Sequence, residues 1–115
     1  MTTGPENNAA PLASDRASAL TELVDIAHGA IVSRVLAKSG GGNVTLFAFD
    51  QGQALSEHTA PFDAMAYILD GEAEITISGK AFHLNSSEMI IMPANEPHAL
   101  KAVKKYKMLL IMVKS

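Results

Sequence analysis

Histidine and carboxylate side chains are the groups in this sequence best suited to chemistry. The chain has 115 residues with four histidines and no cysteine. Thiolate metal sites, cysteine nucleophiles and disulfides are therefore excluded. A metal ion would have to be held by imidazole or carboxylate, and a histidine that titrates near neutral pH could also act as a general acid or base.

The four histidines differ in the surroundings that their neighbours predict. His83 stands between two apolar residues that should be buried, so strand alternation places it on the surface. His28 precedes a glycine and is expected in a loop. His58 and His98 lie in segments typical of strands, and they are the candidates for a site. Ser56 is close to His58, but no Gly-x-Ser-x-Gly turn surrounds it, so a hydrolase triad is not predicted.

Composition excludes several classes of partner. The formal net charge is −3, and the aromatic content is 5%. Five lysines cluster in the last fifteen positions, but so few aromatic residues provide no stacking platform among them, which favours solvated lysines on a turn and an edge strand over a nucleic-acid surface. No window approaches the roughly 18 apolar residues of a membrane span, and no leader pattern is present. We therefore expect a cytoplasmic protein that binds neither nucleic acid nor membrane.

Many short β-type runs separated by turn residues fill most of the sequence. In EAEITIS, the apolar residues Ala73, Ile75 and Ile77 alternate with polar ones, which predicts a strand with one wet face. A glycine-rich stretch at 40–42 separates AIVSRVLAK from VTLFAFD and predicts a hairpin, because a phosphate-binding loop would need a helix after it. The pattern predicts an all-β sandwich or barrel.

Two regions depart from this pattern. Residues 1–17 lack periodicity and are predicted to form a flexible N-terminal tail, which leaves 18–115 as the barrel domain. The run 17–27 is compatible with a short N-terminal helix or with an extended segment through Leu23–Ile26. The segment Met108–Val113 is apolar on both faces, and a second subunit is our first candidate to cover it. We therefore predict a homodimer with this segment at or next to the contact.

Two stretches resemble the motifs of the cupin family. GQALSEHTAPFDAMAYILDG is similar to the first motif, since Gly52, His58 and Gly71 fall at matching spacing. SEMIIMPANEPHALKA is similar to the second motif at Pro93 and His98. The departures fall at residues that the family pattern places in the motifs: alanines replace a histidine and a glutamate at 60 and 64, and Ser87, Asn95 and Ala102 replace two glycines and an asparagine.

The resemblance implies a cupin-type jelly-roll β-barrel with its site inside one end. Family members with the full motif hold a divalent ion such as Mn, Fe, Ni or Zn with three histidines and a glutamate. Here the implied metal ligands are His58 and His98 alone, and two imidazoles make a poor site. The nearby carboxylates that could add a third ligand, none of them on a clearly matching face, are Glu57, Asp63 and Glu96.

The alanines at 60 and 64 also make the predicted interior more apolar. The cavity could then take a small apolar or aromatic ligand. Its candidate lining residues, each of which could equally be core packing, are Phe47, Phe49, Ala60, Ala64, Met65, Met92 and Leu100. We favour a small-molecule-binding barrel of unassigned substrate, with a weak metal site or none at the two histidines. The alternatives are a divalent-metal-dependent enzyme, an oxygenase or isomerase with a ligand from outside the motif, and a sensing or purely structural barrel.

Overall fold

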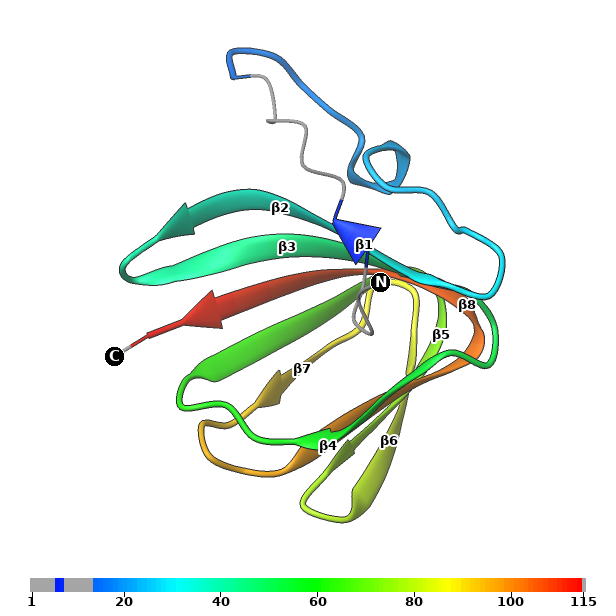
Figure 1. The fold of residues 1–115 in the computed structure, drawn as a ribbon, viewed down its shortest axis with the longest axis vertical. Helices are drawn as coiled ribbons and strands as arrows, with labels where there is room; N and C mark the ends of the chain where they lie inside the picture. Colours follow the sequence, from blue (N-terminus) through cyan, green and yellow to red (C-terminus); the bar gives the residue numbers. More distant parts are fainter. Residues whose placement is uncertain (1–5, 8–13, 115) are drawn as a thin grey trace.

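The structure is a computed structural model that describes residues 6–7 and 14–114. Its elements follow one another along the chain and are almost all strands (Figure 1). Their bounds are β1 (Glu6–Asn7), a 3-10 turn η1 (Leu20–Glu22), β2 (Ile31–Ser39), β3 (Gly42–Phe49), β4 (Ala54–His58), β5 (Asp63–Ile77), β6 (Lys80–Asn85), β7 (Met89–Met92) and β8 (His98–Val113). The all-β prediction is confirmed.

Two long strands, β5 and β8, tie the fold together. Strands pair in the order β1-β2-β3-β8-β5-β6, while β4 pairs with β8 and β7 with β5. The first half of β5 and the second half of β8 form one layer with β2, β3 and β7, which we call the β3 layer. Their other halves form a second layer with β4 and β6, which we call the β4 layer. The two layers face each other around the interior, as Figure 1 shows.

A glycine marks the point where β5 passes from one layer to the other. The β5–β8 register shifts on both sides of Gly71, which lies opposite Tyr106 with φ of 92°. A Cβ atom at this position would lie 2.0 Å from the carbonyl oxygen of Lys105. Only glycine has both the backbone freedom and the space for this crossing. The Gly71 of the first motif therefore has a structural role.

The main core lies between the two layers. Phe49, Ile68, Ile75 and Tyr106 are at most 1% exposed there, and the rings of Phe49 and Tyr106 stack with centroids 4.5 Å apart. Each strand contributes alternate residues to this interior, as the period of two in a strand requires. These large side chains fill the interior between the layers at this end of the barrel.

A smaller core lies outside the barrel, under the segment that precedes β2. Val24 is 1% exposed and packs with Leu46 and Ala48 on the outer face of the β3 layer. Arg34 donates a hydrogen bond from Nη1 to the carbonyl oxygen of Leu23, at 3.1 Å, and so holds the segment down. The chain thus covers part of its own apolar sheet surface.

The helical alternative for residues 17–27 is not found, apart from one turn of 3-10 helix at Leu20–Glu22. No side chain caps this turn, since Ala19 stands at the N-cap position. Leu23 after it has helical backbone angles, φ −85° and ψ −9°, and among the described residues no strand begins between this turn and β2. The extended alternative through Leu23–Ile26 is therefore not confirmed either.

Most of the predicted flexible tail, residues 1–5 and 8–13, lies outside the described residues. Glu6–Asn7, within the same range, pairs in parallel with β2 at Val32 and Ser33. In the described part of the chain, no helix has the length and apolar character needed to cross a membrane.

Candidate functional site

His58 and His98 lie side by side on neighbouring strands. They are register partners where β4 ends and β8 begins. Their ring centroids are 4.4 Å apart with an angle of 72° between the ring planes. Two imidazoles that are forty residues apart in the sequence are thus brought into one place.

An irregularity in β4 brings the first of these rings to the interior. Leu55 pairs with Leu100, but the next paired residue is His58 with His98, so β4 has one residue more than β8 in this interval. In a regular strand, residues three apart face opposite sides. The extra residue acts as a β-bulge and lets both Leu55 and His58 line the same cavity.

Backbone carbonyl groups fix the orientation of both rings. Nδ1 of His58 lies 2.7 Å from the carbonyl oxygen of Ser56, and Nδ1 of His98 lies 3.1 Å from that of Glu96. In each case the partner is two residues earlier in the chain. The two rings are therefore held by equivalent contacts, one on each strand.

The loop before His98 is fastened to the β4–β5 connection and to the end of β5. Asn95 donates its backbone N–H to the carbonyl oxygen of Ala60 at 2.7 Å, and Ala94 donates to Oδ1 of Asp63 at 2.8 Å. The hydroxyl of Ser78 donates to Oε1 of Glu96 at 2.8 Å. These bonds make the rim of the site a defined structure, although the segment contains no regular strand.

The two rings line a cavity of about 190 Å³ inside one end of the barrel. Ten of its twelve lining side chains are apolar. The full lining is Phe47, Leu55, His58, Ala60, Phe62, Ala64, Met92, His98, Leu100, Met108, Leu110 and Met112. This cavity is therefore an apolar space with imidazole as its polar component.

The two histidines differ in exposure. His98 is 5% exposed, whereas His58 is exposed at the mouth. Burial lowers the pKa of His98 below 6.5, because the charged imidazolium loses solvation. The hydrogen bond to Glu96 opposes this effect, and the neighbouring His58 adds to it. The pocket thus favours neutral His98.

The donor set does not fit a resident divalent metal. Among the described residues, no group of three or more His, Asp or Glu side chains is placed to hold an ion. Asp63 and Glu96 already accept the hydrogen bonds of the rim, and Glu57 does not line the cavity. Ala60 and Ala64 line the cavity at the two positions where the family pattern has ligands, but they offer no donor atom.

Five of the seven residues predicted to form a ligand pocket line this cavity with the histidines. They are Phe47, Ala60, Ala64, Met92 and Leu100. Two are placed elsewhere. Phe49 faces the interior but is sealed by its stack on Tyr106, and Met65 points to the outer face of the β3 layer, because it alternates with the buried Ala64 and Ala66.

Five lining residues were missed: Leu55, Phe62, Met108, Leu110 and Met112. The last three belong to the segment that is apolar on both faces. Its even-numbered residues turn to the cavity, and Leu109 packs on the outer core. The two-sided apolar pattern was thus a signal for the cavity as well as for an outer contact.

The other two histidines lie away from the cavity. His28 has a fully exposed side chain 3.9 Å from Asp50. His83 is on β6, where its Nε2 lies 3.4 Å from Oε1 of Glu72, and Lys104 contacts the same carboxylate at 3.1 Å. Both are surface contacts.

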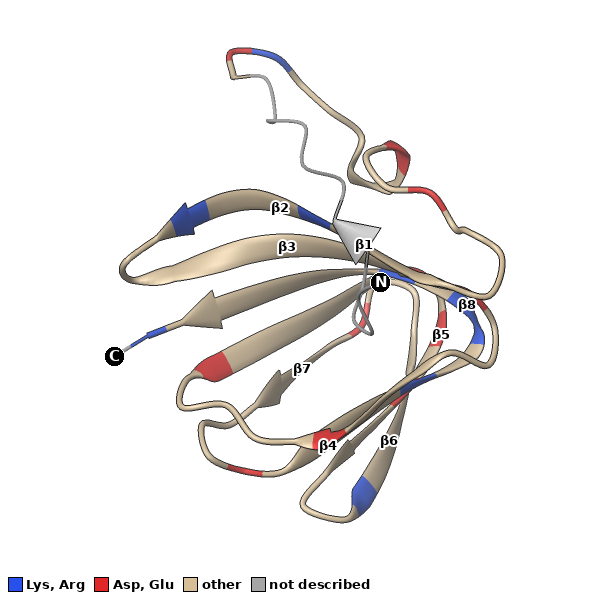
Figure 2. Ribbon diagram, viewed as in Figure 1, with Lys and Arg blue, Asp and Glu red and all other residues tan. Residues whose placement is uncertain are grey.

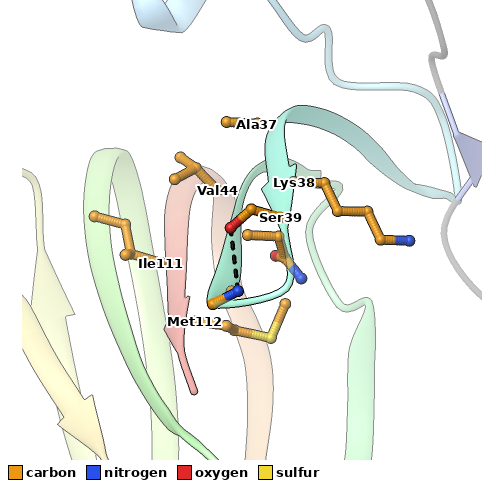
Figure 3. Close-up of a pocket in the computed structure, with 9 residues that line it drawn as sticks. Ala37, Lys38, Ser39, Val44, Ile111 and Met112 are labelled. Atoms are coloured by element: carbon orange, nitrogen blue, oxygen red, sulfur yellow. Dashed lines mark hydrogen bonds between the residues drawn. The ribbon is translucent and has the colours of Figure 1, made fainter. Parts of the chain in front are cut away.

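A second hollow of about 310 Å³ lies at the β2–β3 hairpin (Figure 3). Ser39 there accepts a hydrogen bond from the backbone N–H of Gly41 at 3.2 Å, so its hydroxyl oxygen is engaged within the hairpin. Lys38 belongs to the lining, and its side chain points away from the other labelled side chains in Figure 3. The described residues that line this hollow include no histidine or carboxylate, which makes it a weaker candidate than the cavity.

With the barrel and its cavity described, the family follows from comparison with known proteins. The Cupin domain family model matches residues 45–114, so the chain belongs to the cupin family. No curated protein sequence matches the chain.

Solved structures agree with this assignment. A conserved protein of unknown function from Streptococcus pyogenes is 38% identical with a TM-score of 0.88, and the match covers 92% of this chain and 93% of that one. A cupin superfamily protein from Desulfitobacterium hafniense is 29% identical with a TM-score of 0.86, covering 92% and 97%. A cupin 2 conserved barrel domain protein from Leptotrichia buccalis is 39% identical with a TM-score of 0.80, covering 82% of this chain and 46% of that one.

Proposed function

We propose that the protein binds a small, mainly apolar molecule in the cavity beside His58 and His98. The lining carries this proposal, because ten of the twelve side chains around about 190 Å³ are apolar. A cavity of about 150 Å³ with an aliphatic lining is large enough for benzene. The size and lining therefore support a ligand built on one six-membered ring.

Methionine methyl groups provide a direct test. Met92, Met108 and Met112 line the cavity, while Met65 and Met89 lie on the outer face of the β3 layer. With ¹³C-methyl methionine, benzene should shift the three cavity signals and leave the two outer signals in place. Equal shifts of both groups, or none, would contradict binding in the cavity.

A filled cavity is the matched variant for this test. Ala60→Leu adds side-chain volume at the rim of the cavity and should abolish the benzene-induced shifts. Ala81→Leu adds the same volume at an exposed position of β6 and should leave them unchanged. Retained binding in Ala60→Leu would place the ligand elsewhere.

A metal-dependent oxygenase or isomerase is the second candidate, and one observation favours it. Both Nδ1 atoms are fixed by carbonyl oxygens, an arrangement typical of metal-binding histidines. A metal ion held by these two imidazoles would still need further ligands, and the described side chains of the cavity do not supply them. Elemental analysis of protein purified without chelators or an affinity metal decides the matter: one metal per chain, lost in His58→Ala and His98→Ala, would replace the binding proposal.

The same analysis has a gain-of-function control. Ala60→His with Ala64→Glu restores the two donors that the family pattern has at these positions of the cavity. This variant should acquire one divalent ion per chain. Metal in the double variant and none in the natural sequence would support loss of the metal site in favour of a cavity.

We also propose that a second copy of the chain covers the outer apolar face of the β3 layer. Val44, Ile111, Met65 and Ile91 are successive register partners across β3, β8, β5 and β7. Ile91 and Val113 are each 52% exposed. Figure 2 shows that β3, β7 and the last part of β8 carry no charged residue.

The dimensions of this face suit a sheet of the same kind. Four strands about 4.8 Å apart and about five residues long give roughly 300 Å² in projection. This area could form the apolar centre of a contact between two copies of the chain. The β2–β3 hairpin and the segment before β2 would then form the rim of that contact. An uncharged apolar sheet face can pack against a second face of the same kind, and two-fold dimers are the commonest assemblies.

Light scattering at micromolar concentration tests the dimer. The natural sequence should give twice the chain mass of 12.1 kDa. Ile91→Lys should give a folded monomer, whereas Val103→Lys, at an exposed position on the β4 layer, should remain dimeric. A monomeric natural protein would contradict the proposal.

Cytoplasmic location and the lack of nucleic-acid partners stay predictions of the sequence.

A further inference from the structure

The hydrogen bonds of the two imidazole rings define what the cavity offers a ligand. A carbonyl oxygen can only accept a hydrogen bond, so the Nδ1 atoms that face Ser56 and Glu96 must carry the protons. A neutral imidazole has one N–H. Nε2 of His58 and Nε2 of His98 are therefore bare acceptors in the neutral protein.

These two acceptors have no competing donor beside them. Within the described residues, neither Nε2 is engaged in a hydrogen bond or ion pair in the protein. The other ten side chains that line the cavity have no N–H or O–H group. His98 is buried, and an unpaired acceptor costs free energy away from water, so a ligand that supplies a donor there gains more than one that does not.

We infer that the cavity selects small ring compounds that carry a hydrogen-bond donor, of the phenol class, over apolar isosteres and over carboxylates. This inference rests on the proposed binding function. Toluene has the size of phenol but leaves both acceptors unpaired. Benzoate has acceptor oxygens and a negative charge, and it would meet the lone pairs of both imidazoles, one of them on the buried His98.

The proton positions can be observed without any ligand. Long-range ¹H–¹⁵N spectra of the histidine side chains at pH 8, where imidazoles are neutral, report which nitrogen carries the proton. His58 and His98 should both show protonated Nδ1 and bare Nε2. Protonated Nε2 on both rings would overturn the inference, since the cavity would then offer donors.

Affinities for phenol and toluene at pH 8 test the selection itself. The ratio of the toluene Kd to the phenol Kd should fall about tenfold in His98→Leu, because the loss of one buried hydrogen bond is of that order. His58→Leu, at the more exposed ring, should lower the ratio in the same direction. His83→Leu, on the outside of β6, should leave it unchanged.

The outcomes separate this inference from the function on which it rests. If neither phenol nor toluene binds, the proposed binding function fails. If both bind with the same ratio in the natural protein and both variants, the binding function stands and selection by the imidazoles is overturned. Tighter binding of benzoate than of phenol at pH 8 would also overturn it, because the rings would then act as donors.

Discussion

The two ends of the barrel interior are built from adjacent rows of the same two strands, yet only one end is hollow. At the closed end, Phe49 of β3 is paired with Tyr106 of β8, and their rings stack 4.5 Å apart. One row toward the mouth, Phe47 is paired with Met108, and both line the cavity. The pairing is the same in both rows, so the difference comes from the side chains: two stacked aromatic rings fill one end, and alanines beside two anchored imidazoles leave the other end hollow.

The largest predicted effect on stability is the difference between alanine substitutions in these two rows. Phe49→Ala removes a fully buried ring and should lower the free energy of unfolding by about 3–5 kcal/mol. Phe47→Ala enlarges an existing cavity at a half-buried position and should cost roughly half as much. Urea unfolding of both variants provides the comparison. Equal losses would mean that the two ends are packed alike.

A smaller loss of stability is expected at Gly71, where β5 passes from one layer to the other. Gly71→Ala places a Cβ atom against the Lys105 carbonyl oxygen and should cost about 3 kcal/mol. Gly79→Ala is the matched control, because its φ is also positive, at 81°, but no atom lies near the added Cβ. Denaturation midpoints that shift equally in both variants would show that backbone strain alone is responsible.

The closed end also contains a polar atom without a partner. Within the described residues, the hydroxyl of Tyr106 is buried and has no hydrogen bond, and burial raises the pKa of Tyr106 well above its ordinary value of 10.0. Tyr106→Phe removes this unsatisfied group and should stabilise the protein by about 1 kcal/mol. Thermal unfolding provides the measurement. A clear loss of stability would instead indicate a bridging water.

The smallest effect should come from the cavity end and depend on pH. Because burial lowers the pKa of His98, the unfolded chain takes up a proton there at a higher pH than the folded protein. The stability due to neutral His98 is present above pH 6.5 and is lost as pH falls through the lower folded pKa. Unfolding midpoints between pH 8 and pH 5 should fall less in His98→Gln than in the natural protein. The exposed His83→Gln serves as the control.

The barrel and the meeting of the two histidines could be predicted because they depend on spacing. The positions of Gly52, His58, Gly71, Pro93 and His98 match a family whose fold brings the two histidines together. The physical reason for one of these positions is visible at Gly71, where no larger residue fits. The loss of donors at the two alanines was equally visible in the sequence.

The details of the cavity could not be predicted because they depend on register. Strand alternation separates Met65 from Ala64, but the sequence does not say which set faces inward when both contain apolar residues. The bulge in β4 reverses the alternation between Leu55 and His58 without any glycine or proline inside the strand. The distinction between Phe47 and Phe49 needs the position of Tyr106, which only the three-dimensional pairing supplies.

The length of β8 has a consequence for the time at which the protein can fold. Residues 98–113 are the register partners of β3, β4 and β5, so each of these strands has an open edge where β8 will pair until that segment has been synthesised. Contacts between β3 and β8 span most of the chain, and such distant pairings form slowly. During synthesis, these strand edges must therefore wait for β8, and chaperones that shield exposed strand edges would matter most in that interval.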